Sequence, residues 1–407
     1  MNKTEAQEKL QKIGQEHLLK YYDELDAADQ EKFLEQIDDT DFGVLRFLKE
    51  KEGRARGTFT PLAAMELDEI EARREEFKET GLKAIRDGKV AALLLAGGMG
   101  TRLGSDNPKG MYDIGLTKHV YIFQRIIENL LDVVHESGYP IHLLIMTSEK
   151  NHEATTAFLK EKNYFGYPED RVHFFRQSMA PACGYDGKIL LEGKGRIATS
   201  PNGNAGWYAS MDKVGLVDLL TRDGVKWINV FAVDNVLQRI ADPVFVGASE
   251  LADVSVGAKV VRKAARDEKV GVICLEDGRP SIVEYYELSD EMMDAKDAKG
   301  NPAYNFGVIL NYLFQLPQLK NLTEDHLPMH VVEKKIPCLD ENGNEIHPKS
   351  PNGYKFEQLV LDMIHQLDTC LPFEVVREHE FAPIKNPTGI DSVESARELC
   401  KKNGIEL

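Results

Sequence analysis

Short continuous apolar runs alternate with amphipathic segments from residue 88 onward. The runs at residues 90–96, 141–147 and 227–233 are followed by a glycine, a serine and an aspartate, which is typical of strands buried on both faces. Residues 121–137 have the pattern of an amphipathic helix that ends before Gly138, and Ser148 is predicted to cap the next helix. These strand–helix units predict an α/β fold with a mostly parallel, three-layer sheet.

Further strands are predicted at residues 173–176, 255–261 and 270–275. The dipeptide Asp277-Gly278 follows the last of them and favours a tight turn. We therefore expect the sheet to extend beyond its parallel strands and to accept antiparallel members there.

Residues 1–86 form a region with a helical pattern. Leu10, Leu18 and Tyr21 recur at helix spacing, and Asp29 is predicted to cap a second helix. We expect a helical collar packed on the main domain, with a partner-binding arm as the alternative. The main domain is predicted over residues 87–330, and a small C-terminal part over residues 331–407.

The first apolar run leads into a loop with four glycines and two cations: Gly97, Gly98, Gly100, Arg102, Gly104 and Lys109. Glycine lets a ligand approach the main chain closely, and successive exposed N–H groups form an anion-binding concavity. Cations beside such a loop supply charge for a polyphosphate. The pattern therefore predicts a nucleotide-binding loop at the carboxyl end of a parallel strand.

Two familiar phosphate loops fit this stretch poorly. A Walker A loop needs a glycine, four further residues, and then Gly-Lys followed directly by Ser or Thr, and this pattern is absent. A dinucleotide fingerprint needs glycines that run straight into a helix, whereas Gly98, Gly100 and Gly104 are differently spaced and Pro108 interrupts. The loop is long enough to wrap a whole nucleoside triphosphate.

Composition and charge narrow the class of partner. The 407-residue chain has a net charge of −17, which argues against a general nucleic-acid or membrane-surface binder. Its five cysteines are far apart, which argues against a disulfide framework or a zinc site and indicates a reducing compartment. The sequence shows no signal-peptide core and no apolar run of about 20 residues. We therefore expect a cytoplasmic protein that concentrates its cations locally.

The stretch "LAGGMGTRLGSDNPKGMYDIGL", residues 95–116, resembles the signature loop of the eukaryotic-type UDP-N-acetylhexosamine pyrophosphorylases, and the resemblance extends from residue 60 to residue 390. It implies a GT-A-like nucleotidyltransferase that uses UTP and a hexose 1-phosphate, with Mg²⁺ as the cofactor and Mn²⁺ as a substitute. It also implies N-acetylglucosamine 1-phosphate as the sugar substrate. The expected assembly is a monomer or a weak homodimer without nucleic-acid or membrane partners.

The resemblance assigns a nucleotide-binding role to a set of residues in four segments: Leu95, Ala96, Gly97, Gly98, Lys109, Gln177, Gly203 and Asp234. Asp234 follows a buried strand, so from the residues alone it suits either a Mg²⁺ ligand or a turn cap. In the family the matching aspartate contacts the metal. Gln177 offers both a donor and an acceptor, as a uracil edge requires, and the family glutamine reads uracil.

A second set of residues matches the sugar-binding positions of the family: Asn204, Gly271, Glu284, Tyr285 and Asn305. Other positions near the sugar depart from the family pattern, namely Asn202, Ala205, Val308, Leu359 and Leu361. A pocket of this kind discriminates small changes by only about 1–3 kcal/mol. Glucose 1-phosphate and galactose 1-phosphate therefore stay open as substrates.

The chemistry needs no general base, because a sugar phosphate is already ionised at neutral pH. We expect catalysis by positioning and charge neutralisation, with Arg102, Lys109 and Lys385 as the catalytic residues. Two other classes are alternatives. One is a non-catalytic nucleotide-sugar-binding protein, and the other is a Rossmann oxidoreductase, against which the glycine spacing argues.

Overall fold

The chain folds into two units, each assembled from segments that are distant in the sequence. One unit comprises residues 1–55, 178–206 and 327–360, and the other comprises residues 56–177, 207–326 and 361–407. The structure, a computed structural model, describes residues 1–50, 56–320, 322 and 327–407. The predicted helical region 1–86 is thus divided between the two units, and so is the segment 331–407.

The larger unit is organised around one mixed sheet. In the described part of the chain this sheet has ten strands, seven of them in the order β1–β12–β14–β10–β2–β3–β4, with β11, β13 and β19 beside this path. The strands are β1 (Phe59–Pro61), β2 (Val90–Leu95), β3 (His142–Thr147), β4 (Val172–Arg176), β10 (Trp227–Ala232), β11 (Val256–Arg262), β12 (Val272–Glu276), β13 (Arg279–Val283), β14 (Phe306–Gln315) and β19 (Cys370–Glu374). Their positions confirm the strands predicted from the apolar runs.

The expectation of a mostly parallel sheet holds for only part of it. Strands β10, β2, β3 and β4 are parallel neighbours, whereas β14 is antiparallel to β10, β11 and β12. For one further antiparallel pair, β12 with β13, the physical reason is local and lies in the turn between them. Asp277 and Gly278 have φ values of 52° and 81°, and a two-residue turn of this kind joins only antiparallel strands.

Burial explains why the parallel strands were recognisable. Every residue of β2 and β3 is buried, as a strand with neighbours on both sides and layers on both faces requires. Helix α5 (Ile122–Ser137) ends where predicted, with Gly138 in the left-handed region at a φ of 74°. Helix α4 (Arg74–Arg86) packs closely on α9 (Pro243–Ala252). Gly81 permits this approach, since a Cβ there would lie only 1.8 Å from the carbonyl oxygen of Pro243.

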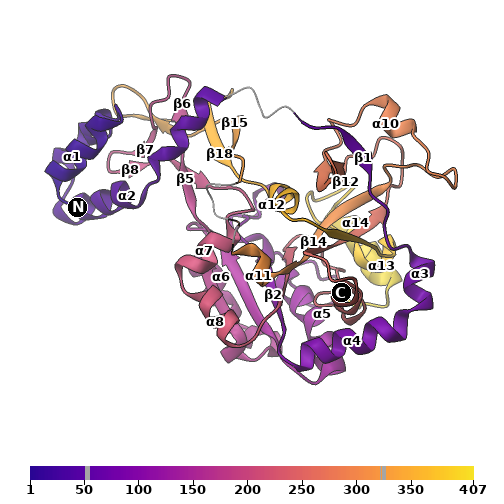
Figure 1. Cartoon of the computed structure of the whole chain (residues 1–407). Coiled ribbons are helices and arrows are strands. Elements are labelled where there is room, and N and C mark those ends of the chain that lie inside the picture. The colour runs from indigo at the N-terminus through magenta and orange to yellow at the C-terminus, as the bar shows by residue number, and fades with distance from the viewer. Residues whose placement is uncertain (51–55, 321, 323–326) are drawn as a thin grey trace. The chain divides into compact units, whose positions relative to one another are not determined.

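The remaining helical segments of the larger unit are short, and several connect strands (Figure 1). They are α3 (Leu67–Ala72), η3 (Thr101–Leu103), η4 (Lys109–Met111), α6 (His152–Glu161), η5 (Asn163–Gly166), η6 (Glu169–Arg171), α7 (Trp207–Lys213), α8 (Leu216–Arg222), α10 (Asp290–Asp294), α11 (Leu316–Leu319), α12 (Val360–Gln366, which begins at the last residue of the smaller unit), α13 (Arg377–Glu380) and α14 (Val393–Lys402). Within the described residues, no helix is long and apolar enough to cross a membrane.

The smaller unit packs the first helices against short strands (Figure 1). Its elements are α1 (Lys3–Lys12), η1 (Glu16–Glu24), α2 (Ala27–Asp39), η2 (Phe42–Glu50), β5 (Met179–Pro181), β6 (Cys183–Gly184), β7 (Leu191–Gly193), β8 (Arg196–Ile197), β9 (Thr199–Pro201), β15 (His330–Lys334), β16 (Cys338–Leu339), β17 (Glu345–Ile346) and β18 (Gly353–Glu357). The cap of α2 is Asp26, whose carboxylate accepts from the N–H of Asp29 at 2.9 Å, so the prediction of Asp29 as the cap was wrong.

Candidate functional site

The carboxyl ends of four parallel strands form one row. The pairs Ala232–Leu95, Leu95–Met146 and Met146–Phe175 join β10, β2, β3 and β4 in register. Each strand is followed, two residues beyond this row, by a polar residue or a glycine, namely Asp234, Gly97, Ser148 and Gln177. Ligands of open α/β sheets bind at this edge.

Gly97 and Gln177 are direct neighbours at this edge. The backbone N–H of Gln177 donates to the carbonyl of Thr147 at 2.8 Å, and its side chain is buried. A Cβ on Gly97 would lie 2.5 Å from Nε2 of Gln177. A side chain at position 97 would therefore displace the amide, so the glycine and the glutamine depend on each other.

The glycine-rich loop closes on itself. The N–H of Gly100 donates to the carbonyl of Asn107 at 2.8 Å, and the N–H of Lys109 donates to the carbonyl of Gly98 at 3.1 Å. Gly104 has a φ of 74°. A Cβ on Gly98 would meet no atom within 4 Å. The loop is thus folded, and its second glycine faces open space.

Asn151 holds this loop and was missed from the sequence. Its Nδ2 donates to the carbonyls of Ala96 and Gly98 at 2.8 and 3.3 Å, and its Oδ1 accepts from the N–H of Ser148 at 2.8 Å. The prediction that Ser148 caps α6 was wrong, because Asn151 is the residue that precedes the helix and no side chain caps it. An asparagine after a strand is an ordinary turn residue, and only the tertiary contacts show its role.

The pKa of Lys109 is affected by three other residues of the predicted site. Burial lowers the pKa of its half-buried ammonium, the Asp234 carboxylate opposes this shift, and the cations of Arg102 and Lys385 add to it. Charges are screened beyond about 10 Å in water, so mutual effects of this kind need short distances. Asp234, Arg102 and Lys385 therefore each lie within electrostatic range of Lys109, although Lys385 is distant from the others in the sequence.

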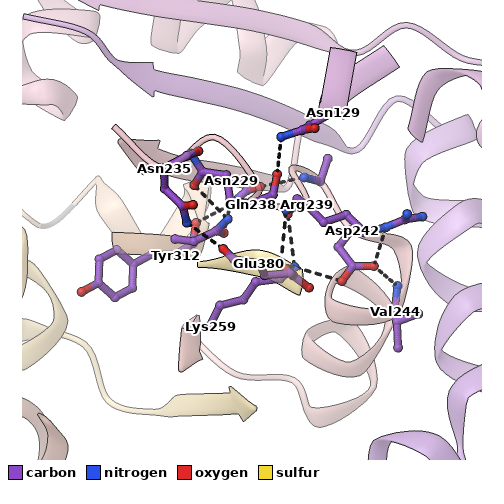
Figure 2. Close-up of polar contacts among 12 residues, drawn as sticks. Asn129, Asn229, Asn235, Gln238, Arg239, Asp242, Val244, Lys259, Tyr312 and Glu380 are labelled. Carbon is purple, nitrogen blue, oxygen red and sulfur yellow. Dashed lines mark hydrogen bonds and ion pairs between the residues drawn. The ribbon is translucent and has the colours of Figure 1, made fainter. Parts of the chain in front are cut away.

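One backbone hydrogen bond and two made by the Asn235 side chain explain how the segment of Lys385 is held beside Asp234. The N–H of Ile384 donates to the carbonyl of Asp234 at 2.9 Å. The side chain of Asn235 donates to the carbonyl of Glu380 at 2.8 Å and accepts from the N–H of Ala382 at 2.9 Å. Figure 2 shows Asn235 beside Glu380. The segment that carries Lys385 is thus attached to the turn that carries Asp234.

A buried ion cluster supports the same segment. Lys259 on β11 is 0% exposed, and its Nζ donates to the carboxylates of Asp242 and Glu380 at 3.0 and 2.6 Å (Figure 2). It also donates to the carbonyl of Arg239 at 3.1 Å. Because buried charges are strongly destabilising without partners, this cluster holds α13 against the loop after β10.

Four of the predicted sugar-binding residues flank the antiparallel strands of the same unit. The carbonyl of Gly271, ahead of β12, accepts from the N–H of Val308, and a Cβ on Gly271 would lie 3.4 Å from Oε1 of Glu284. Burial raises the pKa of Glu284, and the neighbouring Glu287 adds to the shift. Asn305 is half-buried just ahead of β14, and Tyr285 is 42% exposed.

The pairing of β14 with β10 places this second group at the same edge of the sheet as Asp234. Asn311 pairs with Phe231, the residue before the end of β10, so the first half of β14 extends beyond that end. Here the pairing of β14 with β11 shifts register, and Leu310 has a φ of 53°. Such bulges occur beside active sites, where they re-aim side chains.

Gly203 and Asn204 belong to the smaller unit. Gly203 has a φ of 76°, and a Cβ there would lie 2.1 Å from the carbonyl oxygen of Gln358. The Oδ1 of Asn204 accepts from the N–H of Val360 at 2.9 Å. Both positions thus have a local structural reason for their residue type, and their predicted ligand contacts stay predictions.

The donor set at the strand ends suits a magnesium ion that is completed by phosphates. Across the described ranges, no three His, Cys, Asp or Glu side chains form a cluster that could hold a metal. Asp234 is half-buried, and no described residue donates a hydrogen bond to its carboxylate or forms an ion pair with it. Mg²⁺ usually takes one or two carboxylates together with water and substrate phosphates, so Asp234 fits this manner of binding.

Comparisons with known proteins agree with this arrangement. The chain is 37% identical over 424 residues to the human UDP-N-acetylhexosamine pyrophosphorylase-like protein 1. The match covers 98% of this chain and 83% of the human protein. It is 33% identical over 431 residues to the UDP-N-acetylglucosamine pyrophosphorylase of Saccharomyces cerevisiae. That match covers 98% of this chain and 90% of the yeast protein.

A solved structure has the same fold. The uridine diphosphate N-acetylglucosamine pyrophosphorylase of Trypanosoma brucei, in complex with an inhibitor, matches with a TM-score of 0.81 and 27% identity over 96% of this chain and 83% of that chain. A family model described as UTP–glucose-1-phosphate uridylyltransferase matches residues 46–404. The chain therefore belongs to the UTP–glucose-1-phosphate uridylyltransferase family, whose members are nucleotidyltransferases.

Proposed function

We propose that this protein condenses UTP with a hexose 1-phosphate, first of all N-acetylglucosamine 1-phosphate, to form a UDP-sugar and pyrophosphate. The observation that carries the proposal is that the glycine-rich loop, Asp234 and the segment of Lys385 meet at the carboxyl ends of the parallel strands. The charges of Asp234, Arg102 and Lys385 act there on Lys109. The names of the relatives support the acetylated sugar. A GT-A-like architecture is part of the proposal.

The chain's own residues position the reactants and neutralise charge. An oxygen of the sugar phosphate attacks the α-phosphorus of UTP, and the bond to the β-phosphate oxygen breaks as pyrophosphate leaves. Arg102 and Lys109 would stabilise the charge on the leaving pyrophosphate, and Lys385 would hold the sugar phosphate or the α-phosphoryl group. Gln177 would read the uracil edge, and the main chain from Leu95 to Gly98 would contact the nucleotide.

Asp234 would hold Mg²⁺, or Mn²⁺ in its place. A bound divalent cation supplies further neutralisation of phosphate charge. The half-buried carboxylate without a hydrogen-bond partner described above supports this assignment.

The sugar would be held at the antiparallel side of the site. Gly271, Glu284, Tyr285 and Asn305 are the residues we assign to it, and the raised pKa of Glu284 is that of a carboxyl in an apolar setting where sugar hydroxyls are suitable donors. Val308 lies beside Gly271 and differs from the family pattern. Glucose 1-phosphate is therefore the second candidate substrate.

Purified protein with UTP and Mg²⁺ should be assayed for pyrophosphate release against a panel of hexose 1-phosphates. We expect the highest kcat/KM with N-acetylglucosamine 1-phosphate. Equal use of glucose 1-phosphate would indicate a broad UDP-sugar enzyme, and no turnover with any sugar phosphate would refute the proposal.

Gly98→Ala tests the nucleotide loop separately. A Cβ at Gly98 meets no protein atom within 4 Å, so the variant should fold with unchanged stability. If the open space belongs to the nucleotide, its UTP affinity measured by calorimetry should nevertheless fall at least tenfold. Unchanged affinity would remove Gly98 from the site. Gly193→Ala, on β7 in the smaller unit, is the control for nonspecific effects on UTP binding, because a Cβ there would make only an ordinary contact at 3.7 Å.

A further inference from the structure

Lys385 begins a short loop that is closed at its base. The N–H groups of Lys385 and Asn386 both donate to the carbonyl of Asp391, at 2.7 and 3.1 Å. The N–H of Val393 donates back to the carbonyl of Asn386 at 3.0 Å. The next residue after Asp391, Ser392, is fully buried and caps α14 through a reciprocal contact with Ser395. The loop 385–392 is therefore anchored to a helix end.

Asp391 also contacts the side chain of Lys385. Its Oδ2 lies 3.1 Å from Nζ of Lys385, and the two side chains are 31% and 45% exposed. Asp391 has a φ of 53°, a conformation that aspartate tolerates better than most residues. One residue thus binds both the backbone and the ammonium of Lys385.

An ion pair this exposed contributes little to stability, so an effect of Asp391 on activity would act through the position of the Lys385 side chain. The loop is attached to the nucleotide edge on its other side, because the N–H of Ile384 donates to the carbonyl of Asp234. Lysine has a long, flexible side chain with three rotatable donors. A carboxylate that takes one donor restricts the side chain and leaves two donors for phosphate oxygens.

We propose that Asp391 is a positioning residue that acts through Lys385, an inference that rests on the proposed function. Asp391 holds the ammonium of Lys385 in the direction of the phosphates before substrate binds, so that less side-chain freedom is lost in the transition state. It touches neither substrate nor the reacting atoms.

The test is a double-mutant cycle with Asp391→Asn and Lys385→Ala. Asparagine keeps the shape and the positive φ but loses the charge. We expect Asp391→Asn to lower kcat/KM about tenfold in the wild-type background and to cause no further loss in Lys385→Ala. Asp391→Gly, which also accepts a positive φ, serves as a second variant should the first fold poorly.

The control is Asp87→Asn, which removes a surface aspartate paired with Lys83 at 2.6 Å and should leave kcat/KM unchanged. Equal losses from Asp391→Asn in both backgrounds would show a merely structural role and overturn the proposal. So would a large loss in Lys385→Ala with none in Asp391→Asn, and in that case the proposed function would stand. Full turnover in Lys385→Ala, or none in the wild type, would refute the role of Lys385 or the proposed function, and this inference with it.

Discussion

Replacing Lys259 with methionine is the sharpest test of how the C-terminal segment is held. Methionine has a similar length and no charge, so the change removes the ammonium and creates little cavity. It leaves the carboxylates of Asp242 and Glu380 without the partner that lies at 3.0 and 2.6 Å. Lys259 is 0% exposed and the side chain of Glu380 is 15% exposed, so water can replace only part of what the two carboxylates lose.

The expected cost can be bounded from the contacts. Breaking a buried ion pair by removing one partner costs about 3–5 kcal/mol. Nε of Arg239 still lies 3.3 Å from Asp242, so that carboxylate keeps one cation. Burial raises the pKa of Glu380, which makes a protonated, neutral form accessible. We therefore expect a loss near the lower limit, about 3 kcal/mol in the free energy of unfolding.

The loss should depend on pH in a defined direction. A carboxyl with a raised folded-state pKa is protonated in the folded protein at a pH where it is ionised in the unfolded chain. Stability then falls as pH rises through the folded-state pKa. Without Lys259 the pKa of Glu380 is higher still, so the deficit of the variant should be smaller in acid and grow toward neutral pH.

Denaturant unfolding followed by tryptophan fluorescence is the assay. The chain has two tryptophans, Trp207 and Trp227, and both are 0% exposed in the larger unit. The signal therefore reports on the unit that contains Lys259. Lys83→Met, which breaks a surface pair with Asp87, is the control and should cost no more than about 1 kcal/mol. An equally small loss in Lys259→Met would refute our account of the cluster.

Three further predictions concern the nucleotide edge. Asn151→Ala leaves the carbonyls of Ala96 and Gly98 without their donor and should cost about 1–3 kcal/mol in denaturant unfolding and also weaken UTP binding; unchanged values for both would contradict its role. Because burial lowers the pKa of Lys109, UTP affinity should decline as pH rises through a value below the 10.5 of an ordinary lysine. In a calorimetric pH series, Lys109→Arg should move that decline to higher pH. Identical pH profiles would exclude Lys109 from the UTP site. Gly97→Ala displaces the amide of Gln177 and should lower the preference for UTP over CTP in competition binding, whereas an unchanged preference would show that Gln177 does not read the base.

The sequence alone was sufficient to predict those elements and site residues that a local pattern determines. A continuous apolar run identifies a strand buried on both faces, and glycines or an aspartate after it mark the ligand-binding end. This is why β2, β10, the glycine-rich loop and Asp234 could be recognised. The convergence of Lys385 on this edge followed only from resemblance, because no local pattern distinguishes it from a surface lysine.

The missed features depend on contacts between distant segments. Asn151 and Lys259 are unremarkable in their own stretches, and their importance comes from carbonyls and carboxylates elsewhere in the chain. The antiparallel side of the sheet was only partly foreseen, because a turn at Asp277-Gly278 shows a reversal but not which strand pairs with β14. The two incorrect caps are local errors instead, because in each case the residue at the cap lies three positions from the one predicted and a polar residue near a helix start does not by itself show which position is the cap.

The pair of hydrogen bonds from the Asn235 side chain to the backbone at Glu380 and Ala382 has a consequence for biosynthesis. The partners in this contact are separated by 145 and 147 positions in the chain. While the protein emerges from the ribosome, β2, β3, β4 and β10 are available for pairing well before residues 380–385 are made. A nascent chain, or one terminated before residue 380, would therefore possess the glycine-rich loop without its distant lysine, and competence would arise only once that segment has been made.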